Sequence, residues 1–313
     1  MTTLRTAVIG AGHMGSLHAT RLAACAGARL TALADIDTRR AKEVAQPLGC
    51  EVVSDFRDLL GSIDAACVAV PTHLHHEIAA ACMDAGVHVL IEKPLARTLD
   101  EADRLLGIAR DRGLVLQVGH LQRYNPAFVA LAAREGYPLF IDIERLAPFK
   151  PRSTDIDVVL DLMIHDLDLL LALARAPIEH VSASGFPVIT EGIDIANARI
   201  EFADGSVANL SASRVSQATL RKFRVFWSDA YISADLQQQR LRVVRRGAAG
   251  MKEEDEVFPR TDEIKAQAEA FVRAANGAAP PPVTGAQGRQ ALALALEIRS
   301  KVRERLARHG HAH

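Results

Sequence analysis

Short apolar runs alternate with longer amphipathic segments through the first third of the chain. The apolar runs predict strands, and they lie at residues 6–9, 30–34, 51–53, 64–70, 87–91 and 114–118. The segments between them predict helices, at residues 14–26, 41–48, 75–85 and 99–111. Continuous apolar strands, each followed by a helix, are typical of a parallel sheet that helices cover on both faces. We therefore expect residues 1–120 to form a doubly wound α/β domain.

The pattern changes after Gly119, where strands follow one another directly. A strand is predicted at residues 140–146, antiparallel strands at 178–188, 195–202, 206–213 and 221–227, and helices at 126–133, 157–174, 262–275 and 288–307. Residues 121–313 are therefore expected to form an α+β domain with a large, mostly antiparallel sheet and C-terminal helices. The last residues, 309–313, are expected to form a frayed tail, and their histidines are not expected to be metal ligands. An open face of the sheet would need covering, which predicts a homodimer or homotetramer.

Charge and cysteine content argue against several classes of protein. The 313 residues carry 37 basic and 38 acidic side chains without a like-charge block, so we expect no nucleic-acid partner and no anionic membrane. The four cysteines show neither metal-ligand nor CxxC spacing, which predicts reduced core residues and no metal site. A strand begins close to the N-terminus, leaving no room for a signal peptide, and no apolar stretch is long enough to span a bilayer. These features predict a soluble cytoplasmic protein.

A glycine-rich loop, Gly10-Ala11-Gly12-His13-Met14-Gly15, connects the first predicted strand to the first predicted helix. In this context the first glycine permits a tight turn, the second lets the backbone approach a pyrophosphate, and the third lets helix and sheet pack closely. The helix N-terminus then offers free N–H groups and a positive dipole to the phosphates. The loop therefore predicts a Rossmann domain whose cofactor residues include Gly10, Gly12, His13, Met14 and Gly15.

Asp35 ends the second predicted strand, 20 residues after Gly15. A carboxylate at this place accepts hydrogen bonds from the ribose hydroxyls and repels a 2′-phosphate, so NAD is favoured over NADP. Arg39 and Arg40 keep NADP open, although Asp37 adds further negative charge. A turn or helix-capping aspartate is the structural alternative for Asp35.

Pro71 and Thr72 follow the fourth predicted strand, at the sheet edge where ligands bind in open α/β folds. Thr72 is expected to cap the next helix while it faces the dinucleotide. Of the two histidines nearby, His75 is the expected cofactor neighbour, with a surface position as the alternative.

Glu92-Lys93-Pro94 follows the fifth predicted strand at the same edge. Pro94 biases Lys93 towards an extended backbone and so aims the lysine. Taken alone, the two charges are equally compatible with a solvated strand end. Their position beside the predicted cofactor site favours a functional role.

Asp161, His165 and Asp168 are spaced so that they share one face of an otherwise apolar predicted helix. A carboxylate one turn from an imidazole fixes its tautomer and raises its basicity, which suits a general base near neutral pH. The alternative is a helix-capping Asp161 beside a core histidine. Three ionisable groups on one apolar helix favour the catalytic interpretation.

With these motifs together, the chain resembles the Gfo/Idh/MocA family of sugar and polyol dehydrogenases over essentially its whole length. The resemblance rests on the glycine loop, on Glu92-Lys93-Pro94 and on the D-x-x-x-H-x-x-D helix. It implies that Lys93 polarises the substrate hydroxyl, that His165 takes its proton, and that hydride passes to C4 of the nicotinamide. It also implies that Asp161 binds a neighbouring hydroxyl or orients the site, and that Glu92 bonds the nicotinamide ribose.

Residues 118–126 and 155–166 are similar to one branch of this family, which oxidises the 3-hydroxyl of UDP-N-acetylglucosamine for an aminotransferase. The similarity implies a nucleotide-sugar substrate bound in part by Arg123, Tyr124 and Asn125. Arg123 would pair with a diphosphate, and Asn125 would bond an acetamido group. A surface arginine and a helix cap are the alternatives for these two residues, and Gln122 departs from the glutamate frequent in that branch.

Three functions remain open at this point. The leading one is an NAD-dependent 3-dehydrogenase of a nucleotide sugar. The second is a dehydrogenase of a free sugar or inositol, and redox-neutral chemistry is compatible with the same residues. The third is a non-catalytic NAD(H)-binding regulator, which would need neither Lys93 nor His165.

Overall fold

The computed structural model describes residues 2–150, 156–247 and 250–308, and the chain divides into two compact units. Unit 1 contains Met1–Leu121 and Asp262–Arg289, and unit 2 contains Gln122–Thr261 and Gln290–His313. The predicted second domain includes every residue after 120, whereas in the structure residues 262–289 pack with unit 1, because Phe271 lies in its buried core. Asp155 of the UDP-sugar-like segment and the predicted tail at 309–313 lie outside the described residues.

Unit 1 is built on a six-stranded sheet in which all neighbouring strands are parallel. Its strands are β1 (Leu4–Ile9), β2 (Ala28–Ala34), β3 (Glu51–Val53), β4 (Ala65–Val68), β5 (His88–Ile91) and β6 (Leu116–Val118), in the order β3-β2-β1-β4-β5-β6. The chain order reverses between β1 and β4, so ligands are expected at the carboxyl ends of these strands. All four residues of β4 are buried, as a strand covered on both faces requires. The predicted parallel α/β fold is confirmed.

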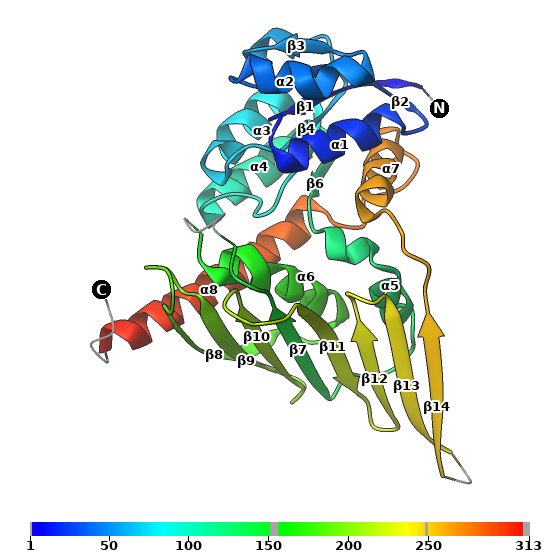
Figure 1. The fold of residues 1–313 in the computed structure, drawn as a ribbon, viewed down its shortest axis with the longest axis vertical. Helices are drawn as coiled ribbons and strands as arrows, with labels where there is room; N and C mark the ends of the chain where they lie inside the picture. The colour runs from blue at the N-terminus through cyan, green and yellow to red at the C-terminus, as the bar shows by residue number, and fades with distance from the viewer. Residues whose placement is uncertain (1, 151–155, 248–249, 309–313) are drawn as a thin grey trace. The chain divides into compact units, whose positions relative to one another are not determined.

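The helices of unit 1 form two groups that flank the sheet (Figure 1). In one group α1 contacts α2 and α7, and in the other α3 contacts α4. They are α1 (His13–Ala23), α2 (Thr38–Ala45), α3 (His75–Asp84), α4 (Leu99–Asp111) and α7 (Glu263–Ala275), with 3-10 helices at Gln46–Leu48, Phe56–Leu59 and Thr72–Leu74. A further 3-10 helix, Leu121–Tyr124, lies at the boundary in the chain between the two units. Local sequence sets their ends: the Thr98 hydroxyl, for example, accepts the Glu101 N–H at 3.2 Å and so starts α4.

Unit 2 is built on an eight-stranded sheet in the order β14-β13-β12-β11-β7-β10-β9-β8. Its strands are β7 (Phe140–Leu146), β8 (Ile178–Phe186), β9 (Ile195–Phe202), β10 (Val207–Ser213), β11 (Leu220–Phe226), β12 (Ala230–Asp235), β13 (Arg240–Gly247) and β14 (Gly250–Val257). Neighbours are antiparallel except β7 and β10, which run parallel, a pairing that the prediction did not specify. The large, mostly antiparallel sheet is confirmed.

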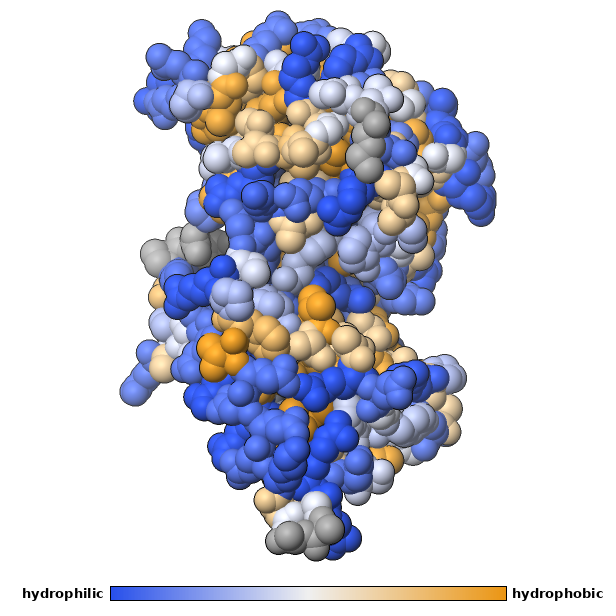
Figure 2. Space-filling model, turned by 90° about the vertical axis from the view of Figure 1, so that its right-hand side faces the viewer, coloured by the Kyte–Doolittle hydropathy of each residue, from blue (hydrophilic) through white to orange (hydrophobic). Residues whose placement is uncertain are grey.

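Three strands of unit 2, β12 to β14, are absent from the sequence-based prediction. β14 buries none of its residues, and β13 buries only Leu241 and Val243, so neither has a long apolar period to read. β14 is also the edge of the sheet and carries the charged run Lys252-Glu253-Glu254-Asp255-Glu256. Figure 2 shows hydrophilic residues over this part of unit 2. Charges of this kind discourage further strand pairing at an exposed edge.

The helices of unit 2 lie on one side of its sheet (Figure 1). They are α5 (Pro126–Ala132), α6 (Ile164–Leu173) and most of α8 (Gly285–Arg308), and a turn of π-helix, Val159–Met163, precedes α6. The prediction of one uninterrupted α-helix at 157–174 is therefore wrong in its first turn. No helix among the described residues is both long and apolar enough to cross a membrane, and all four cysteines are free thiols.

Candidate active site

The glycine loop lies between β1 and α1, against the segment that follows β4. Gly10 has a φ of +100°, and a Cβ at this position would lie 2.4 Å from the carbonyl oxygen of Ala69. A Cβ on Gly15 would lie 1.8 Å from the carbonyl oxygen of Gly10, so both positions require glycine. Gly12 is the N-cap of α1 and has open space where a Cβ would be. The start of α1, at His13 and Met14, is thus open to a phosphate group.

The carboxylate of Asp35 is held beside this loop by three groups. It accepts hydrogen bonds from the backbone N–H of Ala11 at 2.6 Å and of Asp37 at 2.8 Å. The guanidinium of Arg40 lies 3.0 Å from each of its oxygens. Burial alone would raise the pKa of Asp35, but the two N–H donors and Arg40 lower it below its usual value. A fixed anion beside an open helix start fits the ribose and pyrophosphate of NAD.

The segment after β4 differs from the prediction at Thr72. This residue lies in the 3-10 helix Thr72–Leu74, whose N-cap is Pro71. The N-cap of α3 is Leu74, and among the described residues no side chain caps that helix. The prediction that Thr72 caps α3 is therefore wrong, because an extra 3-10 turn intervenes.

His75 ties this segment to the Glu92-Lys93-Pro94 segment. Its side chain is almost fully buried, with Nδ1 2.8 Å from the carbonyl oxygen of Pro94 and Nε2 3.0 Å from that of Val70. Burial lowers the pKa of His75, although both carbonyl oxygens oppose the change. The surface alternative for His75 is wrong, and its imidazole links two loops at the cofactor edge of the sheet.

Glu92 is a buried carboxylate directly after β5. Its Oε1 lies 2.7 Å from Nε2 of His18, a residue of α1, and its Oε2 accepts the backbone N–H of Lys93 at 3.2 Å. A Cβ on Gly119 would lie 3.0 Å from this carboxylate, so the chain after β6 closes over it. Burial would raise the pKa of Glu92, but His18 and Lys93 lower it below its usual value. The carboxylate is therefore ionised and held on both oxygens.

Lys93 follows Glu92 and is half-buried, whereas Pro94 and the next two residues are buried. The peptide bond between Lys93 and Pro94 is cis. The solvated strand end is thus wrong for Glu92, which is buried, and Lys93 is the more accessible charge of the segment.

In unit 2, Asp161 lies in the π-helical turn and His165 in the first turn of α6, and both side chains are half-buried. Asp161 does not cap the helix, because the carboxylate of Asp157 accepts the Leu160 N–H at 3.1 Å in that place. The capping alternative for Asp161 is therefore wrong. A π turn inserts an extra residue into a helix and is frequent at functional sites. The apolar periodicity of the sequence gives no sign of it.

Two other aspartates of α6 form buried ion pairs. Arg145 of β7 donates hydrogen bonds to Asp166 at 2.6 and 2.7 Å, and Arg123 donates to Asp168 at 2.7 and 3.0 Å. Asp168 is 1% exposed, so it does not share an accessible face with His165 as its spacing predicts. Of the three ionisable residues predicted on one stripe, Asp161 and His165 are the accessible ones.

The Arg123-Tyr124-Asn125 segment has structural partners. Arg123 also donates from Nη2 to the carbonyl oxygen of Asp168 at 3.2 Å, so it is not a surface arginine. Asn125 is 1% exposed; its Oδ1 caps α5 by accepting the Ala127 N–H at 3.1 Å, and its Nδ2 donates to the carbonyl oxygen of Leu236 at 3.0 Å. The helix-cap alternative is confirmed for Asn125. Tyr124 is half-buried between them.

Comparison with known proteins assigns this arrangement to a family. Residues 4–120 match the Gfo/Idh/MocA oxidoreductase family with its NAD-binding Rossmann fold, and residues 145–233 match the C-terminal domain of the same family. The chain is 42% identical to the UDP-N-acetylglucosamine 3-dehydrogenase of Acidithiobacillus ferrooxidans, over 98% of this chain and 100% of that enzyme. The chain belongs to the Gfo/Idh/MocA family.

Other comparisons agree with this Gfo/Idh/MocA membership. A solved structure of the Acidithiobacillus ferrooxidans enzyme matches with a TM-score of 0.91 over 96% of this chain and 98% of that one. The myo-inositol 2-dehydrogenase of Thermotoga maritima is 27% identical over 96% of this chain and 97% of its own. The predictions of family, oxidoreductase activity and an NAD cofactor are confirmed.

His18 is a residue of this Gfo/Idh/MocA fold that the sequence-based prediction missed. It lies on the buried side of α1, where its partner Glu92 is 74 positions away in the chain. A single histidine among apolar helix residues carries no signal of such a partner. The missing information is three-dimensional: α1 and the end of β5 must first be placed together by the sheet.

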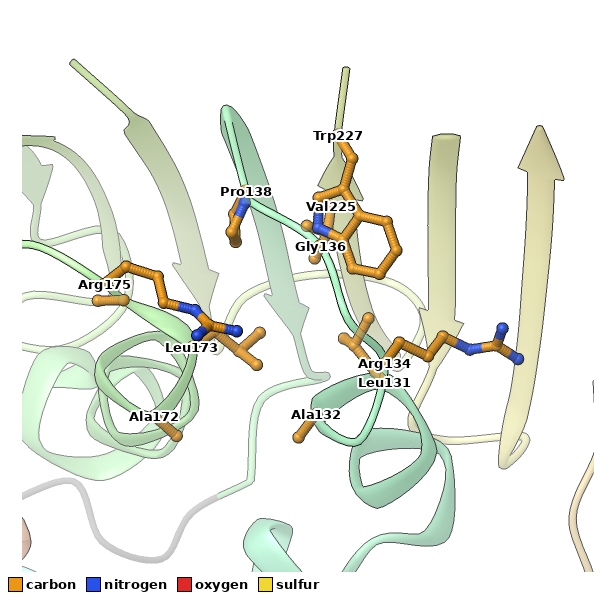
Figure 3. A pocket seen from close by; sticks show the side chains of 11 residues that line it. Leu131, Ala132, Arg134, Gly136, Pro138, Ala172, Leu173, Arg175, Val225 and Trp227 are labelled. Atoms are coloured by element: carbon orange, nitrogen blue, oxygen red, sulfur yellow. The ribbon is translucent and has the colours of Figure 1, made fainter. Parts of the chain in front are cut away.

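A pocket of about 330 Å³ in unit 2 is lined by none of the predicted site residues. Figure 3 shows the Trp227 ring beside Gly136 and the Arg175 side chain reaching in from the end of α6. The pocket is lined by Leu131, Ala132, Arg134, Gly136, Pro138, Ala172, Leu173, Ala174, Arg175, Val225 and Trp227. The candidate chemistry of this oxidoreductase lies elsewhere in unit 2, at Asp161 and His165.

Proposed function

We propose that this protein oxidises the 3-hydroxyl of a nucleotide sugar resembling UDP-N-acetylglucosamine to a 3-keto sugar, with NAD as the oxidant. The observation that carries the proposal is the 42% identity to a UDP-N-acetylglucosamine 3-dehydrogenase over 98% of this chain. That similarity spans both units, so it includes the substrate-facing residues as well as the cofactor domain.

Each accessible residue has a role in the proposed reaction. Lys93 polarises the hydroxyl of the substrate, and His165 accepts the hydroxyl proton as general base. Asp161 binds a neighbouring hydroxyl or orients the substrate. NAD, held at the glycine loop and Asp35, would supply the hydride acceptor for the oxidation of the same carbon. The substrate thus loses one hydride and one proton and becomes a ketone.

The cofactor contacts follow from the geometry of unit 1. The glycine loop, from Gly10 to Gly15, would hold the pyrophosphate, and Asp35 would accept hydrogen bonds from the adenosine ribose. Pro71 and Thr72 lie at the same edge of the sheet, as does Glu92. For Glu92, a bond to the nicotinamide ribose would be made in addition to its contact with His18.

The proposed substrate contacts lie in the Arg123-Tyr124-Asn125 segment of unit 2. Arg123 engages Asp168 through Nε and Nη2, so a diphosphate would meet its Nη1. Tyr124 is half-buried and next to it. Asn125 could bond an acetamido group only by exchanging one of its two backbone partners. We rank Arg123 above Asn125 as a substrate contact for this reason.

The test is a substrate panel. Purified protein is mixed with NAD and UDP-N-acetylglucosamine, other UDP-sugars, glucose or inositol, and NADH absorbance is followed with and without an aminotransferase that consumes 3-keto sugars. We expect NADH from UDP-N-acetylglucosamine and more of it when the ketone is removed. No NADH with any UDP-sugar, together with NADH from inositol or glucose, would contradict the proposal.

A polyol dehydrogenase is the second candidate, because the inositol dehydrogenase of Thermotoga maritima also matches over both units. The same panel separates the two functions. We further propose a homodimer or homotetramer, since the helices of unit 2 lie on one side of its sheet. Light scattering on the purified protein tests this, and a monomer at micromolar concentration would contradict it.

A further inference from the structure

His18 is a buried ionisable residue to which the proposed chemistry gives no role. Its side chain is 0% exposed, and its Nε2 lies 2.7 Å from Oε1 of Glu92. Burial by itself would lower the pKa of His18, but Cys67 and Glu92 raise it to about 10. Glu92 contributes to this rise in the pKa of His18, because a carboxylate 2.7 Å away favours the charged imidazole. His18 and Glu92 therefore form a buried pair of opposite charges.

This pair belongs in part to the proposed catalytic segment, Glu92-Lys93-Pro94, because Glu92 is a member of both. One carboxylate oxygen faces His18, and the other accepts the backbone N–H of Lys93. Gly119 closes over the same carboxylate, which leaves it little room to turn. A buried carboxylate that loses its cation either takes up a proton or attracts another cation. The nearest residue in sequence that could respond is Lys93.

We propose that His18 is a positioning residue of the oxidoreductase site. Through a charge-assisted hydrogen bond it fixes and neutralises Glu92, so that Glu92 anchors the backbone of Lys93 without drawing its amino group away from the substrate. Helix α1 would then have two roles. Its first turn would meet the phosphates of bound NAD, and His18 in its second turn would support Lys93 through Glu92. The inference rests on the role proposed for Lys93 above.

Other ionisable groups face the pair. Cys67 of β4 faces His18, and Lys93 and His75 face Glu92. Cys67 has no contact with the catalytic segment of the kind that Glu92 makes. A Cys67→Ala variant therefore removes one neighbour of His18 while it leaves the His18–Glu92 hydrogen bond in place.

The decisive variant is His18→Gln, because the amide of glutamine keeps a neutral donor near the position of Nε2 and removes the charge. Glu92 then lacks its cation and takes up a proton at a higher pH. We expect the acid limb of the kcat/KM profile to move up by about one pH unit. On that acid limb a shift of one unit lowers kcat/KM about tenfold, and the loss disappears at alkaline pH.

Glu92→Gln and the double variant provide a second measurement. If His18 acts through Glu92, the double variant loses no more activity than Glu92→Gln alone. His88→Asn is the matched control: His88 also belongs to unit 1, its Nδ1 accepts the Val115 N–H at 3.0 Å, and asparagine can keep that bond. We expect His88→Asn to leave the pH profile unchanged, and Cys67→Ala to leave its acid limb unchanged. An equal loss at every pH in His18→Gln, or additive losses in the double variant, would overturn the proposal.

A measurement without substrate separates this proposal from the proposed function. The nitrogen chemical shifts of the His18 imidazole report whether one or both ring nitrogens carry a proton. We expect both to be protonated at neutral pH in the wild-type protein and in its NADH complex. A singly protonated ring would overturn the inference even if UDP-N-acetylglucosamine is oxidised. If only inositol is oxidised, the proposed function fails while the pH profiles, measured with inositol, still test His18.

Discussion

Units 1 and 2 support their proposed catalytic residues, Lys93 and His165, with different kinds of buried charge. In unit 1, Lys93 follows a carboxylate that is paired with an imidazole, in the contact between Glu92 and His18. In unit 2, His165 precedes Asp166, which is paired with the guanidinium of Arg145. A histidine gains or loses its charge within the accessible pH range, whereas an arginine stays charged. The support in unit 1 is therefore sensitive to pH, and that in unit 2 is permanent.

The two ion pairs also differ in how many carboxylate oxygens they occupy. Arg145 holds both oxygens of Asp166 in a two-pronged contact that joins α6 to β7, which fixes a helix on a sheet. His18 holds one oxygen of Glu92 and leaves the other for the backbone of Lys93. We infer that the arginine pair is scaffolding, while the histidine pair adjusts the charge around Lys93, the proposed catalytic residue.

Replacing the accessible residue of each unit should have the largest effect. Lys93→Met and His165→Asn remove the groups proposed to polarise and deprotonate the substrate hydroxyl. Each should lower kcat by about 10²- to 10⁴-fold, while NADH binding, measured by fluorescence titration, is retained. If turnover were unchanged in either variant, the accessible groups would not be the catalytic ones, and the comparison would lose its basis.

Breaking the buried pair of unit 2 should have the next largest effect, and on stability. Arg145→Met leaves the Asp166 carboxylate buried without its cation, which should lower the free energy of unfolding by about 3–5 kcal/mol. Trp227 is the one tryptophan of the chain and belongs to unit 2, so its fluorescence reports urea unfolding of that unit.

The control for Arg145→Met is an exposed ion pair of the same unit. Arg240 donates to Asp255 at 2.7 Å between two outer strands, and Arg240→Ala should leave the free energy of unfolding nearly unchanged because water screens the pair. Similar losses in Arg145→Met and Arg240→Ala would show that burial does not make the Arg145 pair a scaffold.

The fold of unit 1 was readable from sequence because its signals are local. Apolar runs mark β1 to β6, and the glycines sit where a Cβ would clash with Ala69 or Gly10. Unit 2 was readable in part: β8 to β11 were predicted, whereas β12 was missed although its burial alternates from residue to residue. β14, which buries none of its residues, was missed as well, and the π turn around Asp161 has no compositional mark.

The candidate site residues were also predictable from local sequence, whereas their buried partners were not. Motif spacing singles out Lys93 and His165, but it cannot tell which neighbouring carboxylates are already paired. Asp168 looks like a partner of His165 on a helical wheel and is bound to Arg123, and Glu92 looks like an exposed charge and is bound to His18. These partners lie 45 and 74 positions away, so only the packed structure reveals them.

The Asp35–Arg40 contact offers a smaller test of how unit 1 uses charge. Asp35→Ser removes the carboxylate that repels a 2′-phosphate and frees the guanidinium of Arg40 from its 3.0 Å contacts. The ratio of kcat/KM for NADP to that for NAD should rise roughly tenfold to a hundredfold, in keeping with one or two hydrogen bonds to a charged group. The double variant Asp35→Ser/Arg40→Ala should lose most of this gain. An unchanged ratio in Asp35→Ser would place cofactor selection elsewhere.

The smallest expected effect is a difference between the two units in how stability depends on pH. Because the pKa of His18 is raised from 6.5 to about 10, its contribution is complete below pH 6.5 and is lost as the pH rises towards about 10. Because the pKa of Glu92 is lowered, its contribution is present above its ordinary value of 4.5 and is lost as the pH falls through the lowered value. An arginine–aspartate pair has no loss on the alkaline side in this range.

Hydrogen exchange measures this difference within one molecule. Between about pH 7 and about pH 9, after correction for the intrinsic exchange rate, amides of β5 should lose protection while those of β7 keep theirs. In His18→Gln the loss in β5 should disappear, because no imidazole charge remains to be titrated. Equal pH dependence of β5 in the wild type and in His18→Gln would mean that His18 is uncharged in the folded protein. The two units would then differ in geometry alone, and the support of Lys93 would be a neutral hydrogen bond.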